Sequence, residues 1–169
     1  MKVKTIIAYS LVIVFTIQLQ ACSNNGFHLR KTHQLPANHQ KIQIQNAPED
    51  NDFTKALKLA IEESGGSIVD KADTLINIEN FREGKRVVAY DKERKARIYL
   101  LFLKFEYDIL KSNAKLSLQH KMRRINLDRT FVYDANYALG KAEEEKQIRS
   151  DLYAEASRLI LLRLQYSKK

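Results

Sequence analysis

Residues 97–110 read RIYLLFLKFEYDIL, and this stretch decides the fold. Its odd-numbered positions are apolar or aromatic from Tyr99 onwards, with the period of two that belongs to one face of a β-strand. Its even-numbered positions begin with Ile98, Leu100 and Phe102 and are then charged. A strand with one wholly apolar face packs that face into a core, so the stretch predicts the strongest strand of the chain.

The residues before this strand predict its first partner. Residues 74–81 alternate in the same way and residues 87–90 continue them, after an interruption at Glu83-Gly84. The charged run Asp91–Arg94 then turns the chain. Because the connection is short, the two strands are expected to be antiparallel neighbours.

The residues after the central stretch predict a second antiparallel partner. Ser112-Asn113 makes a turn, and residues 115–128 return as a strand. The apolar phase of that strand jumps between Met122 and Ile125. A change of phase needs an extra residue, so we expect a β-bulge at Arg123-Arg124.

Two helices and one more strand complete the pattern. Residues 41–45 alternate like a half-buried strand, and residues near Ala142 to Tyr166 have helical spacing. Between them, Asn51 or Asp52 can cap a helix that Gly65-Gly66 ends. The apolar face of that helix is formed by Phe53, Ala56, Leu57, Ala60 and Ile61.

These elements predict an α+β fold in the order strand, helix, three strands, helix. We expect two helices on one face of a four-stranded mixed or antiparallel sheet, as a two-layer sandwich over residues 41–169. A chain of this length is enough for one such domain.

The central strand has more apolar surface than this arrangement uses. The helices account for its odd positions but leave Ile98, Leu100 and Phe102. Either the long helix or the N-terminal segment covers that side, or the side chains form an exposed patch that a partner covers. Arg123-Arg124 and the turn at Asp91–Lys95 would surround such a patch with positive charge, which suits an anionic amphiphile or an acidic partner wall.

The first residues predict export and a lipid anchor. Two lysines precede an apolar run over residues 6–19, which is short for a membrane span and typical of a secretory signal. The run ends in Leu19-Gln20-Ala21-Cys22, which fits a lipobox except for the polar Gln20. We therefore expect residues 1–21 to be a lipoprotein signal peptide, Cys22 to be acylated, and residues 22–40 to be an extended tether. A plain signal peptide with an incidental cysteine is the alternative.

The composition and motifs argue against catalysis and metal binding. The chain has 29 Lys and Arg, 20 Asp and Glu, and one Cys, so it has neither a disulfide framework nor a cysteine zinc site. It contains no nucleophile elbow, P-loop, HExxH or dinucleotide fingerprint. The histidines lack ligand spacing, and Glu143-Glu144-Glu145 is expected to be a solvated helix start. We expect no catalytic site, cofactor or metal, and no nucleic-acid partner despite the charge of +9.

Several motifs resemble one known family. Cys22 is followed by Gly26-Phe27-His28-Leu29-Arg30 and by Leu35-Pro36. Towards the end come Ala138-Leu139-Gly140-Lys141-Ala142 and a Leu-Tyr-Ala-Glu-Ala run from Leu152. Together these resemble LptE (RlpB), the family of lipopolysaccharide-assembly lipoproteins.

The resemblance implies a non-enzymatic protein, lipid-anchored in the outer membrane. Proteins like LptE plug the lumen of the outer-membrane β-barrel LptD, support its folding, and bind lipopolysaccharide. Ser23 after the acylated cysteine, in place of Asp, favours the outer membrane.

The resemblance also implies two places that contact lipopolysaccharide. Lys141 matches a basic residue at the start of the last helix. At the turn between two strands the matching position is Asp91, so its neighbours Lys92, Arg94 and Lys95 would supply the charge. Solvated lysines at a turn and a helix start are the plainer interpretation.

Two other functions fit an anchored protein of this size. One is an auxiliary lipoprotein of an envelope lipid-transport ABC system, and the other is an outer-membrane hydrolase with an unrecognised site.

The lipid anchor is open to direct measurement. We expect mass spectrometry of the protein from its own membranes to find Cys22 as the first residue, with acyl groups on its thiol and its amine. An unmodified thiol at Cys22, or recovery of the chain from the cytosol, would contradict the prediction.

Overall fold

The computed structural model describes residues 34–111, 122–134 and 138–166. Its elements are η1 (Ala37–His39), β1 (Lys41–Gln45), α2 (Asp52–Glu63), β2 (Ser67–Ile68), β3 (Thr74–Tyr90), β4 (Ala96–Lys111), β5 (Arg123–Val132) and α3 (Ala138–Tyr166). The predicted α+β class is confirmed. The predictions for the signal peptide, Cys22 and the strand over residues 115–121 lie outside the described residues. The predicted extended tether over residues 22–40 is described only from residue 34, and there it is wrong, because Leu35 and His39 are buried and Ala37–His39 form η1.

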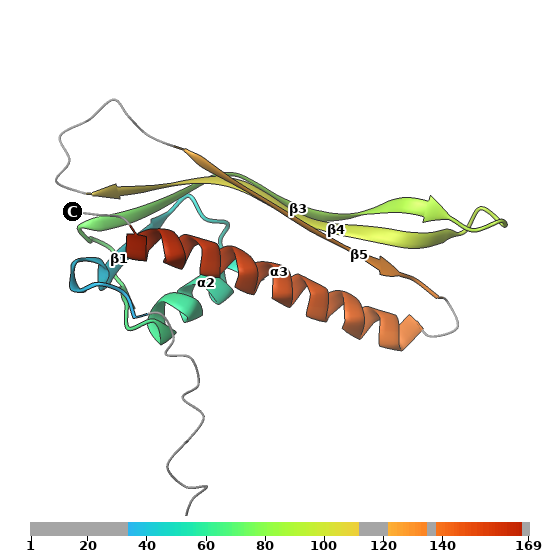
Figure 1. Cartoon of the computed structure of the whole chain (residues 1–169), viewed down its shortest axis with the longest axis horizontal. Helices are drawn as coiled ribbons and strands as arrows, with labels where there is room; N and C mark the ends of the chain where they lie inside the picture. Colours follow the sequence, from blue (N-terminus) through green and yellow to red (C-terminus); the bar gives the residue numbers. More distant parts are fainter. Residues whose placement is uncertain (1–33, 112–121, 135–137, 167–169) are drawn as a thin grey trace, which may run out of the picture. The chain divides into compact units, whose positions relative to one another are not determined.

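The sheet contains five strands in the order β2-β1-β3-β4-β5 (Figure 1). β1 is parallel to both β2 and β3, whereas β4 is antiparallel to β3 and β5. The prediction of four strands is therefore wrong. The missing strand, β2, has two residues, and two residues are too few to show an alternating pattern.

Two predicted irregularities lie elsewhere in the structure. Glu83 and Gly84 do not interrupt β3, because they pair with Leu103 and Phe102 of β4. The register of β3 shifts instead after Glu79 and near its end. The bulge predicted at Arg123-Arg124 is also wrong, since β5 begins at Arg123 and pairs with β4 without a register shift.

The first helix begins and ends as its sequence predicts. The side chain of Asn51 accepts a hydrogen bond from the backbone N–H of Phe53 at 2.8 Å. The helix ends before Gly65, whose φ of 80° is a left-handed conformation that glycine adopts without a steric penalty. The second helix, α3, begins at Ala138 and so extends further toward the N-terminus than predicted.

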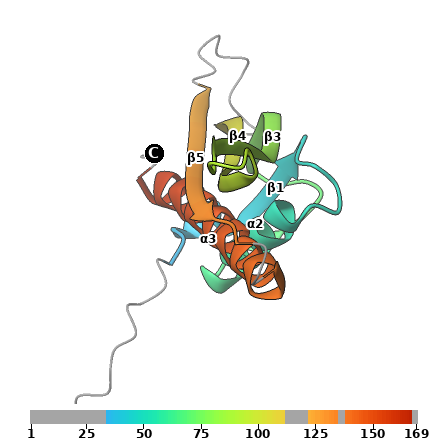
Figure 2. The same ribbon diagram turned by 90° about the vertical axis from the view of Figure 1, so that its right-hand side faces the viewer.

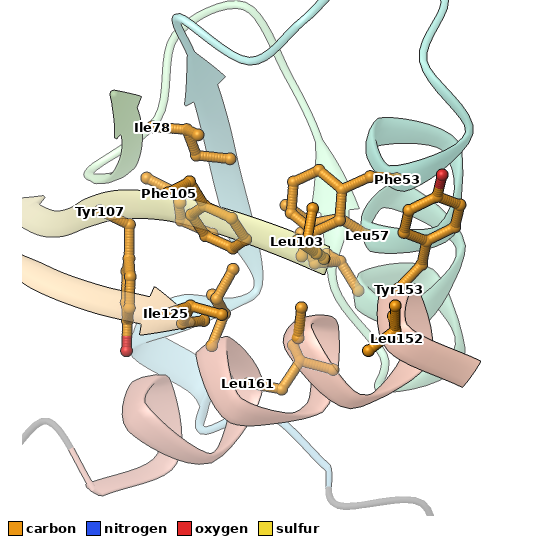
Figure 3. Packing of buried hydrophobic residues seen from close by; sticks show 14 of the residues in the cluster. Phe53, Leu57, Ile78, Leu103, Phe105, Tyr107, Ile125, Leu152, Tyr153 and Leu161 are labelled. Carbon is orange, nitrogen blue, oxygen red and sulfur yellow. The ribbon is translucent and has the colours of Figure 1, made fainter. Parts of the chain in front are cut away.

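Residues of both helices and of the sheet share one hydrophobic core. Leu101, Leu103 and Phe105 of β4 are buried in it, as the odd-numbered pattern predicts. Figures 1 and 2 draw α2 and α3 on the same side of β3 and β4, and Figure 3 shows the side chains that meet there. We refer to this side of the sheet as the inner face.

Phe53 of α2 lies at the centre of the aromatic part of the core. Its ring is 5.4 Å from that of Phe81 and 4.9 Å from that of Phe105, measured between centroids. The ring of Tyr153 in α3 is 6.3 Å away. One side chain therefore contacts aromatic rings of β3, β4 and α3, and its own exposure is 0%.

A carboxylate connects β3 to α3 and to the N-terminal cap of α2. Glu83 of β3 accepts hydrogen bonds from the hydroxyl of Tyr153 at 2.7 Å and from the side-chain amide of Asn51 at 2.8 Å. Lys85, two residues further along β3, forms an ion pair with Glu145 of α3 at 2.6 Å. These polar contacts join the first half of α3 to β3.

The aromatic contacts predict a large effect of truncating Phe53. Phe53→Ala should lower the free energy of unfolding by about 3–5 kcal/mol, because it leaves a cavity among the rings. Urea denaturation measures this change. Leu59→Ala, on the exposed side of the same helix, is the control and should change stability by less than about 0.5 kcal/mol. Equal effects of the two substitutions would contradict the described core.

The hydrogen bond to Glu83 predicts a pH effect on stability. Burial and Glu83 raise the pKa of Tyr153 from 10.0 to about 12, so folding favours the neutral hydroxyl. Above pH 10 the unfolded chain loses this proton first, and stability falls as the pH rises toward 12. Tyr153→Phe should flatten that part of the denaturation curve.

The measurement is the urea midpoint at several values between about pH 9 and about pH 12, for both proteins. Tyr90→Phe, which alters an exposed tyrosine, is the control and should keep the original slope. Parallel curves for Tyr153→Phe and the unchanged protein would show that Tyr153 does not contribute.

Candidate functional site

The outer face of the sheet, opposite the core, carries an apolar patch. Ile98, Leu100 and Phe102 of β4 are half-buried and do not belong to the core. Val132 of β5 pairs with Ile98 and is 47% exposed. We call these four residues the outer patch. Within the described ranges, both helices lie on the other side of the sheet (Figure 1).

A glycine shapes the position of Phe102 in the outer patch. Gly84 lies opposite Phe102 in the β3–β4 ladder. A Cβ atom at residue 84 would lie 2.8 Å from Cζ of the ring, which is too close. The glycine therefore lets the ring lie across the neighbouring strand. On its own strand, the ammonium of Lys104 is 5.7 Å from the ring centroid, within range of a cation–π contact.

Cations of β3 that the sequence did not predict lie beside the outer patch. Arg86 is exposed and pairs with Leu100, and Arg82 pairs with Lys104. The signal that could have found them is the alternation of β3. Once the strand continues through Gly84, positions 82, 84 and 86 share the face of the patch.

The turn between β3 and β4 presents two unpaired cations. The carboxylate of Asp91 accepts hydrogen bonds from the backbone N–H groups of Glu93 and Lys95, at 2.9 and 2.8 Å. The Lys95 ammonium forms an ion pair with Glu93. In the described part of the chain, Lys92 and Arg94 have no acidic partner. Asp91 therefore organises the turn while its neighbours carry free positive charge.

Lys141 lies near the start of α3 and has a local acidic partner. Its ammonium is 2.6 Å from a carboxylate oxygen of Glu144. Glu143 pairs with Lys146, and Glu145 pairs with both Lys85 and Arg149. The three consecutive glutamates thus point to different cations, as expected on a helix.

The structure separates Arg123 and Arg124 from the outer patch. Arg124 pairs with Glu106 in the β4–β5 ladder, and its guanidinium lies 2.7 Å from that carboxylate. Hydrogen bonds from Arg124 and Asn80 lower the pKa of Glu106. Arg123 pairs with Tyr107 and so belongs to the inner face. The two arginines therefore lie on different faces, at the opposite end of β4 from Ile98.

The described residues hold neither a clustered metal site nor a helix suited to crossing a membrane. No three His, Cys, Asp or Glu side chains in these ranges gather closely enough to bind an ion. No described helix combines the length and the apolar character of a membrane span. His39 is buried, and its Nδ1 lies 2.8 Å from the hydroxyl of Thr74.

Comparison with solved structures finds the same fold in bacterial lipoproteins. An uncharacterized lipoprotein B from Nitrosomonas europaea is 24% identical with a TM-score of 0.65, over 83% of this chain and 90% of that one. The rare lipoprotein B of Shewanella oneidensis is 16% identical with a TM-score of 0.59, over 73% and 92% of the two chains. A minor lipoprotein of Acinetobacter baumannii is 12% identical with a TM-score of 0.58, over 75% and 91%.

The family comparison identifies the chain. No curated protein matches it at the level of sequence. A family model, LptE, described as lipopolysaccharide-assembly, matches residues 40–164. That match includes every helix and strand from β1 almost to the end of α3. The chain therefore belongs to the LptE family of lipopolysaccharide-assembly proteins.

Proposed function

We propose that this chain is an outer-membrane lipoprotein that plugs the lumen of the LptD β-barrel, supports the folding of that barrel, and binds lipopolysaccharide. Its family supports a role in lipopolysaccharide assembly, and the family is non-enzymatic. The observation that carries the proposal is the outer patch. A protein that fits inside a barrel must present apolar side chains to the barrel wall, and in the free monomer those side chains would be exposed to water.

The position of the helices leaves the outer patch available to a partner. Residues of α2 and α3 share the core with the inner face of the sheet, and no helix of the described residues lies over the outer face. Removing apolar surface from water contributes about 25 cal/mol per Å². Apolar patches bordered by polar residues are typical of interaction sites. Arg82, Arg86 and Lys104 supply such a border.

The predicted lipid anchor at Cys22 and the outer patch fit the same role. The anchor would hold the protein at the membrane in which its partner barrel lies. Acylation of Cys22 would fix the N-terminus in the bilayer, and the residues between Cys22 and Leu35, which is buried in the core, would connect the anchor to the folded domain. More than one acyl chain makes anchoring stable. The protein would therefore stay in the same membrane as the barrel even if its own affinity for the barrel were low.

The cations at one end of the sheet support lipopolysaccharide binding. Lys92 and Arg94 are available to bind an anion, because the carboxylate of Asp91 accepts hydrogen bonds from backbone N–H groups of the turn and does not pair with them. Lys141 would exchange its ion pair with Glu144 for a phosphate. A partly exposed ion pair between neighbouring turns of one helix contributes on the order of 1 kcal/mol, so a phosphate can replace it.

Depletion in the producing bacterium tests the proposed function. We expect the protein to co-purify with an outer-membrane barrel, and we expect its depletion to lower both the folded barrel and the surface lipopolysaccharide. Normal barrel folding together with normal lipopolysaccharide export after depletion would contradict the proposal. Recovery of an inner-membrane lipid transporter in place of a barrel would also contradict it and favour an auxiliary role in an ABC system.

The role of Lys141 predicts a selective loss of binding. Lys141→Glu should weaken lipopolysaccharide binding more than about fivefold, because losing an attraction of about 1 kcal/mol lowers affinity about fivefold and the introduced repulsion lowers it further. Its stability should change little, since the half-buried side chain forms one local ion pair, with Glu144 of the same helix. The salt dependence of binding should fall in parallel.

Titration of lipopolysaccharide at low and high salt measures both effects. Lys146→Glu is the matched control, since Lys146 lies on the same helix and also pairs with a glutamate. If Lys141→Glu and the unchanged protein bind equally well, Lys141 has no such role.

A further inference from the structure

A second cationic region lies at the end of the sheet away from Lys92 and Lys141. The end of β4, the start of β5 and the last turns of α3 enclose an open hollow of about 450 Å³. It is lined by Tyr107, Arg123, Ile125, Leu159, Leu162 and Arg163. Figure 3 shows Tyr107 extending from β4 toward α3.

Two guanidiniums face this hollow without neutralisation. No carboxylate in the described ranges forms an ion pair with Arg123 or Arg163, whereas Arg124 nearby is held by Glu106. Burial raises the pKa of Tyr107, and the charges of Arg123 and Arg163 oppose that increase. Both cations line the same hollow as Tyr107. Two unpaired arginines beside a hydroxyl donor can bind an anion, and the planar guanidinium matches phosphate geometry.

The rest of the lining is apolar and partly open to water. Leu159 of α3 lines the hollow and is 38% exposed. Leu162 is half-buried, and Tyr166 at the mouth is 73% exposed. A small inorganic ion would leave these side chains in contact with water. A ligand with a hydrocarbon part beside its charge would cover them.

We propose that this hollow binds the phosphate group of an amphiphile, with Arg123 and Arg163 holding the phosphate, Tyr107 donating a hydrogen bond, and Leu159 and Leu162 contacting the adjoining hydrocarbon. The inference rests on the proposed function, since it gives a lipid-binding protein of the envelope a second contact. That contact is distinct from the first, because the nine residue steps along β4 from Ile98 to Tyr107 span about 30 Å.

The two sources of such a phosphate are lipid A and glycerophospholipids, and direct titration separates them. The full acylated protein in detergent is titrated with diphosphorylated lipid A, with phosphatidic acid, and with inorganic phosphate. Arg123→Gln combined with Arg163→Gln should weaken binding of a phosphorylated amphiphile at least tenfold. Arg158→Gln removes the same charge from another side of α3 and should leave affinity unchanged.

The fold of each variant is checked by circular dichroism and thermal unfolding. If the double variant fails to fold, Arg163→Gln alone provides the test, because that side chain is exposed in the last turn of α3. Tyr107→Phe keeps the ring in place and should weaken binding several-fold through the lost hydroxyl.

The outcomes separate this inference from the proposed function. If the double variant loses affinity for lipid A alone, or for lipid A and phosphatidic acid, the result supports binding at the hollow and identifies which lipid supplies the phosphate. Unchanged affinity of the double variant for both lipids, or binding of inorganic phosphate as tight as that of either lipid, would overturn the inference. In that case, weaker lipopolysaccharide binding by Lys141→Glu would still support the proposed function. A protein that binds neither lipid nor barrel would contradict both the inference and the proposed function.

Discussion

Strand β4 is apolar on both faces along half of its length, and the rest of the structure depends on that constraint. On the inner face, Leu101, Leu103 and Phe105 are buried beneath residues of α2 and α3. The outer face of the same strand carries Ile98, Leu100 and Phe102. Helices on one side of a sheet bury only that face. The packing of the core therefore leaves the second apolar row of β4 available to another molecule or segment.

The two faces therefore serve different purposes. Inner-face packing holds the elements together, with Phe53 and Glu83 joining α2, β3 and α3. The outer face and the two ends of the sheet contribute little to that core and can present apolar surface and cations to other molecules. Lys92 and Arg94 are at one end, and Arg123 and Arg163 are at the other.

The sequence predicted those elements whose periodicity is long and uninterrupted. Residues 41–45 and 97–110 match β1 and β4, because alternation over these stretches has a single interpretation. The pair of residues in β2 is too short to show a period. The course of β3 through Gly84 could not be deduced, because a glycine there suggests a break until Phe102 is known to need the space.

The same limits apply to the candidate site. Lys92, Arg94 and the outer patch were found because they lie next to one another in sequence or alternate along one strand. Arg86 was missed together with the continuation of β3. Arg163 contacts the region of Arg123 only through the packing of α3 on the sheet, and no local pattern reveals such a juxtaposition.

Crosslinking from Leu100 in intact cells tests the central claim most directly. A photoreactive residue at this position, in the middle of the outer patch, should form an adduct with an outer-membrane β-barrel. Irradiated cells that yield only uncrosslinked protein, or adducts with inner-membrane components alone, would contradict the account that the second apolar face of β4 exists to fit that partner.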